Sequence, residues 1–274
     1  MMDKAPDYLL GHGERELERL QLQASIIGGV TSRLIRESGI RAGMRVLDIG
    51  CGAGDVSMLL AEAVGPEGTV VAFDREARAI ETASARAQAA GFRNIEFIVA
   101  SDDVLSDGPP FDAAIGRYIL IHQADPVAMV RRAAQAVRPG GIVAFHEIAL
   151  TCPHQVCAPA VDLFTRVSAC LAALWAASLP HHDIAERLMG CFEEAGLSAP
   201  RLIWESVVGG CESPIARWVG LSYLAVLPRL LRLGIKPADQ GDPDTLIERL
   251  EAAIVACRPQ IVARPQSCAW AIRA

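Results

Sequence analysis

The chain has 274 residues, of which 51% are hydrophobic and 21% charged, and its formal net charge is −6. This composition is typical of a packed globular protein and excludes a disordered chain, which combines low hydrophobicity with high net charge. Lys4 and Lys236 are the only lysines among the 26 basic residues, and the arginines are scattered. We therefore expect no nucleic-acid partner, because such proteins concentrate basic residues in a patch or stripe.

The N-terminus contains no apolar run of the kind that directs secretion, so we expect a cytoplasmic protein. The two most apolar stretches, 167–179 and 215–227, are shorter than the roughly 20 residues that a membrane-spanning helix needs, so we expect no membrane contact. The eight cysteines form no C-x-x-C pair, and Cys152, His154 and Cys157 lack a fourth ligand at a usual spacing. The sequence therefore predicts reduced thiols and no bound metal.

The first predicted element is a long amphipathic helix over 14–38, because apolar and small side chains recur there at steps of three and four residues. Beyond Arg41, short apolar runs that each end in a polar or glycine turn alternate with helical stretches. The runs predict strands at 45–49, 69–73, 95–99, 111–115 and 142–146. The stretches between them predict helices near 55–64, 76–90 and 125–138. Asp125 can cap the last of these helices, and Pro126 suits its first position.

Strands that alternate with helices at this spacing predict a parallel sheet covered on both faces, with ligands at the carboxyl ends of its strands. Beyond Leu150 the composition shifts toward alanine, leucine and cysteine. There we predict helices near 156–179, 181–195, 213–233 and 243–261, and strands at 201–208 and 267–272. The chain is thus expected to divide into a lid helix, a ligand-binding core, and a helical cap with the last two strands, at 1–40, 41–150 and 151–274.

The most informative segment is VLDIGCGAGD, in which an apolar strand leads directly into Gly50, Gly52 and Gly54. Without Cβ atoms, the backbone can turn sharply and let a ligand approach the amides at the start of the next helix. Asp74 ends the following strand, where a carboxylate can accept both hydroxyls of an unphosphorylated ribose. A dinucleotide site has the spacing G-x-G-x-x-G, whereas here the third glycine comes one residue early and an aspartate would face the pyrophosphate. The sequence therefore disfavours NAD.

These segments resemble the class I S-adenosylmethionine-dependent methyltransferases, and in particular a bacterial branch that acts on small molecules. The resemblance covers roughly residues 8–150 and is carried by 46–54, 73–74, 111–122 and 138–145, with a similar lid segment at 8–12 and 16–23. Together with the predicted elements it gives an expected α/β, Rossmann-like fold. Its seven-stranded sheet is mostly parallel with an antiparallel last strand and helices on both faces, and a lid helix and a helical cap are added to it.

The resemblance implies that the cofactor is S-adenosyl-L-methionine. The glycine turn would receive its methionine end, Asp74 would hold the ribose, and Asp48 would anchor the turn and the amino group. Arg117 would border the sulfonium, while Tyr8 and Gln23 would close over the cofactor. The full set of cofactor-binding residues expected in this way is Tyr8, Gln23, Asp48, Gly50, Cys51, Gly52, Gly54, Asp74, Arg75, Asp102 and Arg117.

One position departs from the pattern of the family. An acid usually follows the third strand directly and contacts the adenine amine, but this chain has Val99-Ala100-Ser101-Asp102-Asp103. Ser101 takes the place of the acid by alignment. We predict that Asp102 serves instead, which requires a shift of the loop by one residue.

Methyl transfer from a sulfonium is an in-line displacement, so positioning and exclusion of water can supply most of the catalysis. A base is needed only where the acceptor must lose a proton. His146 ends the fifth predicted strand at the substrate edge of the sheet, which makes it the first candidate for a base or a substrate-orienting donor. His122, after the fourth strand, is the second candidate. For both residues the alternative is a structural histidine that fixes its surroundings.

The aromatic side chains of the second half are expected to lie mostly in the core, because aromatic residues at helical spacing usually pack. The same half supplies most of the large apolar surface that can line a pocket, so we expect a small and largely apolar acceptor. The predicted protein is a methyltransferase that works as a monomer or homodimer. Three alternatives stay open: a protein of the same fold that binds the cofactor without methylating, a nicotinamide-dependent oxidoreductase, and a methyltransferase acting on macromolecules.

Overall fold

The computed structural model describes residues 14–101, 109–152 and 156–274, and these form two compact units. The cap unit comprises the described residues of Met1–Ile27, Leu150–Ser178 and Ser206–Pro265. The sheet unit comprises those of Gly28–Ala149, Leu179–Glu205 and Gln266–Ala274. Helix α1, Glu14–Ser38, contributes to both units, and the boundary falls between Ile27 and Gly28.

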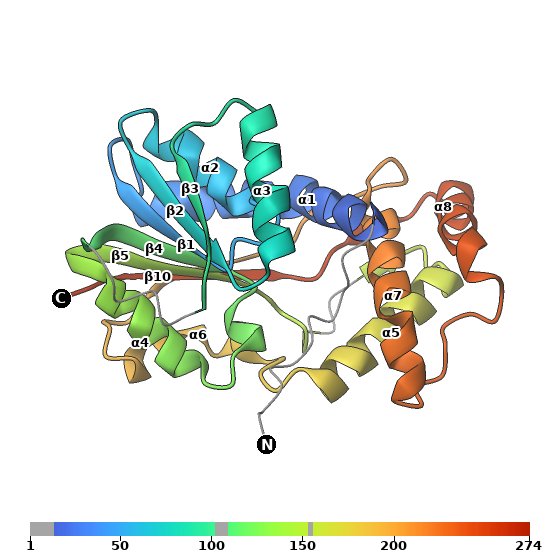
Figure 1. Cartoon of the computed structure of the whole chain (residues 1–274). Coiled ribbons are helices and arrows are strands. Elements are labelled where there is room, and N and C mark those ends of the chain that lie inside the picture. Colours follow the sequence, from blue (N-terminus) through green and yellow to red (C-terminus); the bar gives the residue numbers. More distant parts are fainter. Residues whose placement is uncertain (1–13, 102–108, 153–155) are drawn as a thin grey trace, which may run out of the picture. The chain divides into compact units, whose positions relative to one another are not determined.

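A seven-stranded sheet in the order β3-β2-β1-β4-β5-β10-β7 forms the centre of the sheet unit (Figure 1). Its strands are β1 Arg45–Ile49, β2 Thr69–Asp74, β3 Ile95–Val99, β4 Phe111–Arg117, β5 Val137–Ile148, β7 Arg201–Glu205 and β10 Gln266–Ile272. Strands β1 to β5 are parallel, and β10 runs antiparallel to both β5 and β7. The predicted α/β sheet with its antiparallel last strand is therefore confirmed.

Helices cover both faces of this sheet, as the alternating pattern predicts (Figure 1). Helices α2, Asp55–Val64, and α3, Ala77–Ala89, lie on the same face as the second half of α1. Helices α4, Pro126–Ala136, and α6, Leu188–Glu194, cover the other face, where the rings of Phe145 and Phe192 meet edge to face. Two short 3-10 helices, Leu120–His122 and Ile184–Glu186, complete the unit.

Helix α4 begins as the sequence predicts. The carboxylate of Asp125 accepts a hydrogen bond from the backbone N–H of Ala128 at 2.9 Å, and Pro126 occupies the first turn, where no N–H is needed. The helix ends at Ala136, two residues before the predicted boundary, and β5 begins at once. Arg138 precedes a proline, which disfavours the helical conformation at that residue and fits the early end.

The cap unit is mainly helical and contains the first half of α1 together with α5, α7 and α8, at Asp162–Ser178, Ile215–Arg232 and Leu246–Cys257, and the 3-10 helix Pro243–Thr245. It also holds a small antiparallel sheet in the order β6-β9-β8, at Val156–Ala158, Gln260–Val262 and Val208–Gly209. Within the described residues, no helix has the length and apolar character needed to cross a membrane.

The small sheet corrects three predicted elements. The helix expected over 156–179 begins only at Asp162, because 156–158 pairs as β6. The strand expected over 201–208 ends at Glu205, and Val208 pairs with β9 instead. The helix expected to reach 261 ends at Cys257, where Arg258 adopts a left-handed conformation at φ +49°.

The aromatic side chains of the second half are mostly buried, as predicted. Phe164, Trp218 and Tyr223 lie in the core of the cap unit. Trp175 is only partly buried, and Trp204 has 48% of its surface exposed. Trp204 lies on β7, the last strand of the large sheet.

Candidate cofactor site

The glycine turn between β1 and α2 adopts a shape that requires glycine. Gly50, Gly52 and Gly54 have φ of +64°, +52° and +83°, a region that residues with a side chain rarely occupy. A Cβ at Gly50 would lie 2.4 Å from the Ile119 side chain, and one at Gly54 would lie 3.0 Å from Ala83 Cβ. At Gly52 no described heavy atom lies within 4 Å of that position. Gly52 therefore faces the space that a ligand can approach.

Asp74, at the end of β2, is held beside this turn by two backbone amides. Its Oδ2 accepts a hydrogen bond from Gly52 N at 2.9 Å, and its Oδ1 accepts one from Glu76 N at 3.0 Å. Each carboxylate oxygen retains a lone pair for a further donor. The arrangement fits the predicted ribose role, because two adjacent hydroxyls can bond to the two oxygens.

The turn itself is anchored to the strands beneath it. Cys51 N donates to Phe73 O at 2.9 Å, and Gly54 N donates to Cys51 O at 2.9 Å. Cys51 is buried, and burial raises the pKa of its thiol, so this side chain stays protonated. Its position is consistent with a structural part in the turn.

Asp48, in β1, lies inside the sheet unit rather than on its surface. Its Oδ2 accepts a hydrogen bond from Ser57 Oγ of α2 at 2.5 Å. Burial raises the pKa of Asp48 to about 7, and the Ser57 bond opposes that rise. This contact ties α2 to β1 and supports the predicted anchoring role, while the implied bond to the cofactor amino group stays a prediction.

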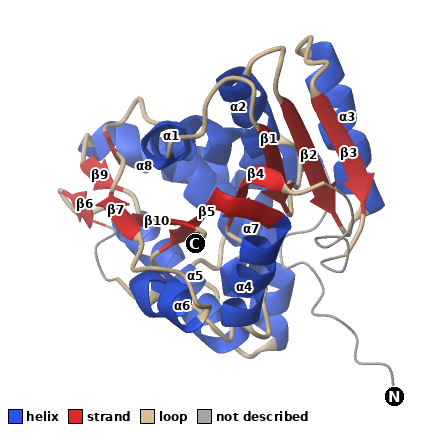
Figure 2. Ribbon diagram, turned by 90° about the vertical axis from the view of Figure 1, so that its left-hand side faces the viewer, coloured by secondary structure: helices blue, strands red, loops and turns tan. Residues whose placement is uncertain are grey.

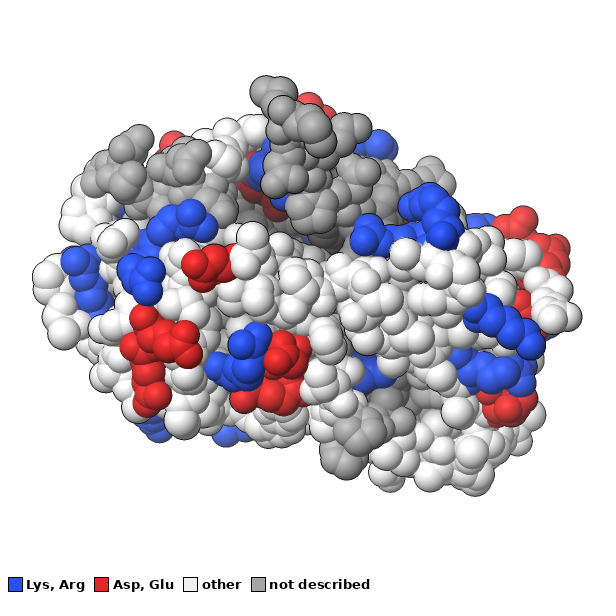
Figure 3. Space-filling model, turned by 90° about the horizontal axis from the view of Figure 1, so that it is seen from below, with Lys and Arg blue, Asp and Glu red and all other residues white. Residues whose placement is uncertain are grey.

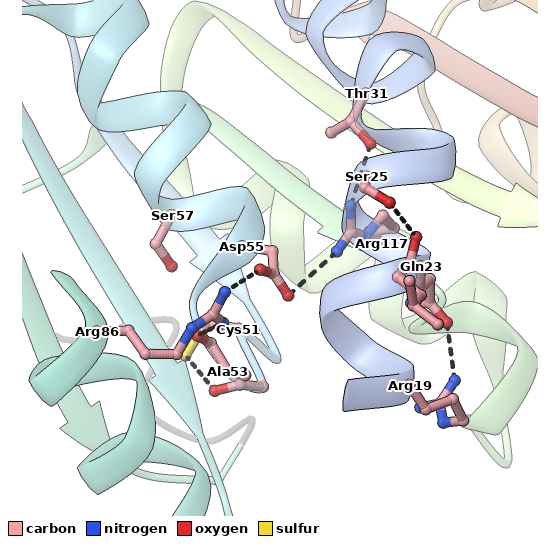
Figure 4. A network of polar contacts seen from close by, with 12 residues as sticks. Arg19, Gln23, Ser25, Thr31, Cys51, Ala53, Asp55, Ser57, Arg86 and Arg117 are labelled. Atoms are coloured by element: carbon pink, nitrogen blue, oxygen red, sulfur yellow. Dashed lines mark hydrogen bonds and ion pairs between the residues drawn. The ribbon is translucent and has the colours of Figure 1, made fainter. Parts of the chain in front are cut away.

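Asp55, the first residue of α2, joins three elements around the turn (Figure 4). Arg86 of α3 donates to its Oδ1 at 2.7 Å and also to Ala53 O at 2.5 Å. On the other side, Arg117 Nη2 of β4 lies 4.0 Å from Asp55 Oδ2. A negative charge at a helix N-terminus is also favoured by the helix dipole. The sequence predicts Asp55 only as a charge that disfavours pyrophosphate, and its role between Arg86 and Arg117 was not predicted.

Behind the site, a chain of buried hydrogen bonds begins at Arg117. Its Nη1 donates to Thr31 Oγ1 of α1 at 3.3 Å, as Figure 4 shows, and Thr31 Oγ1 lies 3.1 Å from His146 Nδ1. His146 Nε2 lies 3.0 Å from Gln266 Oε1, which also accepts from the Tyr118 hydroxyl at 2.6 Å. Because Gln266 Oε1 is an acceptor, the consistent assignment places the imidazole proton on Nε2 and lets Nδ1 accept from Thr31.

His146 is therefore enclosed in the sheet unit with both ring nitrogens engaged. It is fully buried, and burial together with the Arg117 charge lowers its pKa to about 3. The imidazole is neutral at physiological pH. The sequence made His146 the first candidate for a general base. This geometry favours instead a fixed role in hydrogen bonding. His122, the second candidate, ends its 3-10 helix, and desolvation together with the Arg75 charge lowers its pKa to about 4, so it is also neutral at physiological pH.

Glu147, which follows His146 in β5, holds the loop after β4. Its Oε1 accepts hydrogen bonds from Ile119 N at 3.0 Å and Leu120 N at 2.8 Å. The carboxyl is fully buried, and burial raises its pKa to about 8. Tyr118, in the same loop, has φ of +60°. A buried acid thus fixes the loop that follows Arg117.

Two other expected residues contact side chains outside this cluster. Arg75 is exposed and 3.9 Å from Glu76. Gln23 belongs to the cap unit, where its Oε1 accepts from Arg19 at 3.0 Å beside a buried pair of Arg19 and Glu16. Tyr8, Asp102 and His154 lie outside the described residues. The structure thus brings together the glycine turn, Asp48, Cys51, Asp74 and Arg117 at the carboxyl ends of β1, β2 and β4.

The comparisons with known proteins agree with this geometry. A family model described as a methyltransferase domain matches residues 40–196, which is more than half of the chain. The chain belongs to this methyltransferase family. The match begins just before β1 and ends just after α6, so it includes the glycine turn, Asp74 and the loop after β4.

Relatives of this chain match over shorter stretches. Ubiquinone biosynthesis O-methyltransferase of Paracidovorax citrulli (strain AAC00-1) is 36% identical over 109 residues, which are 39% of this chain and 44% of that protein. Aklanonic acid methyltransferase DauC of Streptomyces sp. (strain C5) is 39% identical over 116 residues, which are 41% of this chain and 52% of that protein. The matched stretches span about half of the length of these two relatives.

A solved structure confirms the fold of the chain. The crystal structure of a SAM dependent methyltransferase from Aquifex aeolicus superposes with a TM-score of 0.50 at 16% sequence identity. It covers 68% of this chain and 91% of that chain. At this level of identity, the likeness concerns the fold.

Proposed function

We propose that this methyltransferase transfers the methyl group of S-adenosyl-L-methionine to a small, largely apolar organic acceptor. The observation that carries the proposal is the open glycine turn at Gly52, whose N–H is bonded to the Asp74 carboxylate. An adenosine ribose on Asp74 and an amino-acid tail on the turn would lie in the order that the cofactor requires. Membership of the methyltransferase family supports the same reading.

The residues present fit such a cofactor. The turn offers backbone amides at the start of α2, Asp74 offers two acceptor oxygens, and Arg117 offers a buried positive charge beside them. When bound, S-adenosyl-L-methionine supplies an electrophilic methyl group on its sulfonium. Arg117 is held by Thr31 and Asp55, so its guanidinium is already oriented before any ligand binds.

The chain contributes mainly position and exclusion of water. The loop after β4 is fixed by Glu147, by Tyr118 and by its packing on Gly50, so its residues have one arrangement beside the cofactor turn. Fixed walls of this kind favour an in-line approach of the acceptor. Where the acceptor must lose a proton, we assign the base to His122, because the neutral His146 has both ring nitrogens occupied.

An apolar acceptor is supported by the core of the cap unit, where Phe164, Trp218 and Tyr223 are buried among aliphatic side chains. Two relatives carry names that refer to ubiquinone biosynthesis and aklanonic acid, which is consistent with a small organic substrate. We further propose a cytoplasmic protein without a nucleic-acid partner. In support of that, basic and acidic side chains are interspersed with neutral ones on the face that Figure 3 shows.

The test is release of S-adenosylhomocysteine from S-adenosyl-L-methionine in the presence of a panel of phenols, terpenoids, carboxylates and highly charged acceptors. We expect turnover on apolar members of the panel. Preference for the highly charged acceptors contradicts the acceptor class. Cofactor binding without turnover on any member favours the alternative, a protein that binds the cofactor without methylating.

A further inference from the structure

We propose that a second copy of this chain binds along β7, so that two copies pair antiparallel across a two-fold axis and continue the sheet. β7 is the last strand of the seven-stranded sheet, where Figure 2 shows it next to β10, and within the described residues β10 is the only strand that forms a hydrogen-bonded ladder with it. Its other edge therefore presents backbone N–H and C=O groups that a further strand can bond. The inference is independent of the chemistry of the cofactor site.

Two exposed apolar side chains stand beside this edge. Leu202 is 43% exposed and Trp204 is 48% exposed, while Ile203 between them is buried. Because side chains alternate along a strand, Leu202 and Trp204 share one face. That is the face of α6, since Leu202 pairs with Ala269, which pairs in turn with Phe145 beneath α6.

The symmetry of the pair determines its register. A two-fold axis perpendicular to the sheet keeps each face on its own side, so residues that face each other must come from the same face of β7. The register that uses all five residues places Ile203 opposite Ile203 of the partner subunit. It then places Leu202 opposite Trp204 of the partner subunit, and Arg201 opposite Glu205 of the partner subunit.

This register is complementary in charge as well as in shape. Arg201 is exposed and Glu205 is 32% exposed, and the two-fold axis creates two pairs of opposite charge at the ends of the strand. Both side chains are already oriented, because Arg201 lies over the Trp270 ring at 5.2 Å and Glu205 accepts from Arg33 at 2.6 Å. Charged residues at an edge usually discourage pairing, but here they attract a second copy in this register.

The apolar pairs supply the remaining attraction. Tryptophan is enriched among the residues that dominate binding energy at interfaces, and a half-exposed tryptophan on an edge strand is well placed for that role. A five-residue strand buries less area than the roughly 1,600 Å² of a standard interface. We therefore expect a weak dimer whose population depends on protein concentration.

The experiment is sedimentation velocity on the full chain over a wide range of protein concentration. The wild type should show a monomer–dimer equilibrium. Arg201→Glu places glutamate against glutamate, and Glu205→Arg places arginine against arginine, so each variant alone should remain monomeric. An equimolar mixture of the two should associate again, because an all-acidic edge then faces an all-basic edge in this register.

The mixture distinguishes the proposed contact from damage to the fold, since two misfolded variants cannot restore each other. Circular dichroism and affinity for S-adenosyl-L-methionine serve as controls, because neither residue belongs to the cofactor site. Trp204→Ala should weaken dimerisation about tenfold, which corresponds to about 1.4 kcal/mol. A wild type that stays monomeric, variants that dimerise as the wild type does, or a mixture that fails to associate would each overturn the proposal.

Discussion

The sheet unit and the cap unit differ in how they use their buried polar groups. The sheet unit encloses Asp48, His146, Glu147 and Gln266, and hydrogen bonds link them to the cofactor turn or to the loop after β4. The cap unit also buries polar groups, such as Arg19 with its partners Glu16 and Gln23 on α1, but other ion pairs of this unit, such as that of Arg217 and Glu18, are more than a third exposed. A buried polar group is costly unless it is satisfied, so its retention in the sheet unit points to the part of the molecule where geometry must be exact.

The largest expected effect comes from removing the carboxylate that joins the turn to the ribose position. Asp74→Ala should weaken binding of S-adenosyl-L-methionine about 100-fold, equivalent to about 3 kcal/mol, because two charge-assisted bonds are lost. Isothermal titration calorimetry measures the change. Asp239→Ala in the cap unit is the control. It removes a carboxylate that bonds Arg249, outside the cofactor site, and should leave the affinity unchanged. If both variants lose affinity for S-adenosyl-L-methionine equally, the cofactor site is not specific to the sheet unit.

A matched pair of glycine variants tests the packing of the turn. Gly50 and Gly91 have φ of +64° and +85°, so alanine is strained at both. Only the Cβ at Gly50 meets a neighbour, Ile119, because no described atom lies within 4 Å at Gly91. Gly50→Ala should therefore lower the free energy of unfolding by about 1–3 kcal/mol more than Gly91→Ala in urea titrations. Similar losses would show that the turn does not pack on the loop as described.

The buried hydrogen-bond chain can be broken at Thr31 with little change of shape. Thr31→Val leaves His146 Nδ1 without its hydroxyl donor and should lower the free energy of unfolding by about 1–3 kcal/mol. Thr165→Val in the cap unit is the control. Its hydroxyl donates to Val161 O, but Thr165 N also donates to that carbonyl, so the expected change is within about 0.5 kcal/mol. If Thr31→Val leaves the free energy of unfolding unchanged, the result would argue against this chain of hydrogen bonds.

The raised pKa of Glu147 predicts how stability depends on pH. A carboxyl whose pKa is higher in the folded state favours folding when protonated, so its contribution is present at low pH and is lost as pH rises toward about 8. Asp48, with a pKa of about 7, acts in the same direction. Between pH about 6.5 and about 8, the free energy of unfolding should fall by on the order of 1 kcal/mol.

Glu147→Gln distinguishes the contributions of the two carboxyls. It should make the free energy of unfolding depend less steeply on pH and leave only the part that Asp48 contributes. Denaturant titrations at several pH values measure it. Glu251→Gln, at an exposed position of α8, should keep the wild-type slope. A slope that is unchanged in Glu147→Gln would mean that this acid is already ionised in the folded protein.

The smallest effect is expected at the surface of the cap unit. Arg217→Gln removes ion pairs with Glu18 and Glu251 whose side chains are all more than a third exposed, so the loss should stay below about 1 kcal/mol. Thermal unfolding measures it. A loss as large as that of Thr31→Val would remove the difference between the two units.

Local sequence pattern was sufficient for most of the sheet unit. The apolar runs and glycine turns predicted β1 to β4 and β10 within two residues, because strand and helix periods are properties of neighbouring residues, while β5 begins five residues before its predicted start. The short strands β6, β8 and β9 were missed, since two or three residues carry no recognisable period. The aromatic residues of the second half were expected mostly in the core, but the edge position of Trp204 depends on the order of strands, which the period does not reveal.

The candidate site was predictable where a motif determines the backbone, as at the glycine turn and Asp74. The polar partners were not, because the hydrogen bond from His146 to Gln266 joins residues 120 apart in sequence. Thr31 falls within the three- and four-residue period of the first predicted helix, but that pattern does not reveal His146 as its partner. Position at the end of β5 suggested a base at His146, whereas burial is a property of the folded unit.

The most direct test of the account is a calorimetric titration of the purified chain with S-adenosyl-L-methionine and, separately, with NAD. The account predicts saturable binding of the first at one site, because the turn at Gly52 and the Asp74 carboxylate form that site. It predicts no binding of the second. Binding of NAD, or no binding of S-adenosyl-L-methionine, would contradict it.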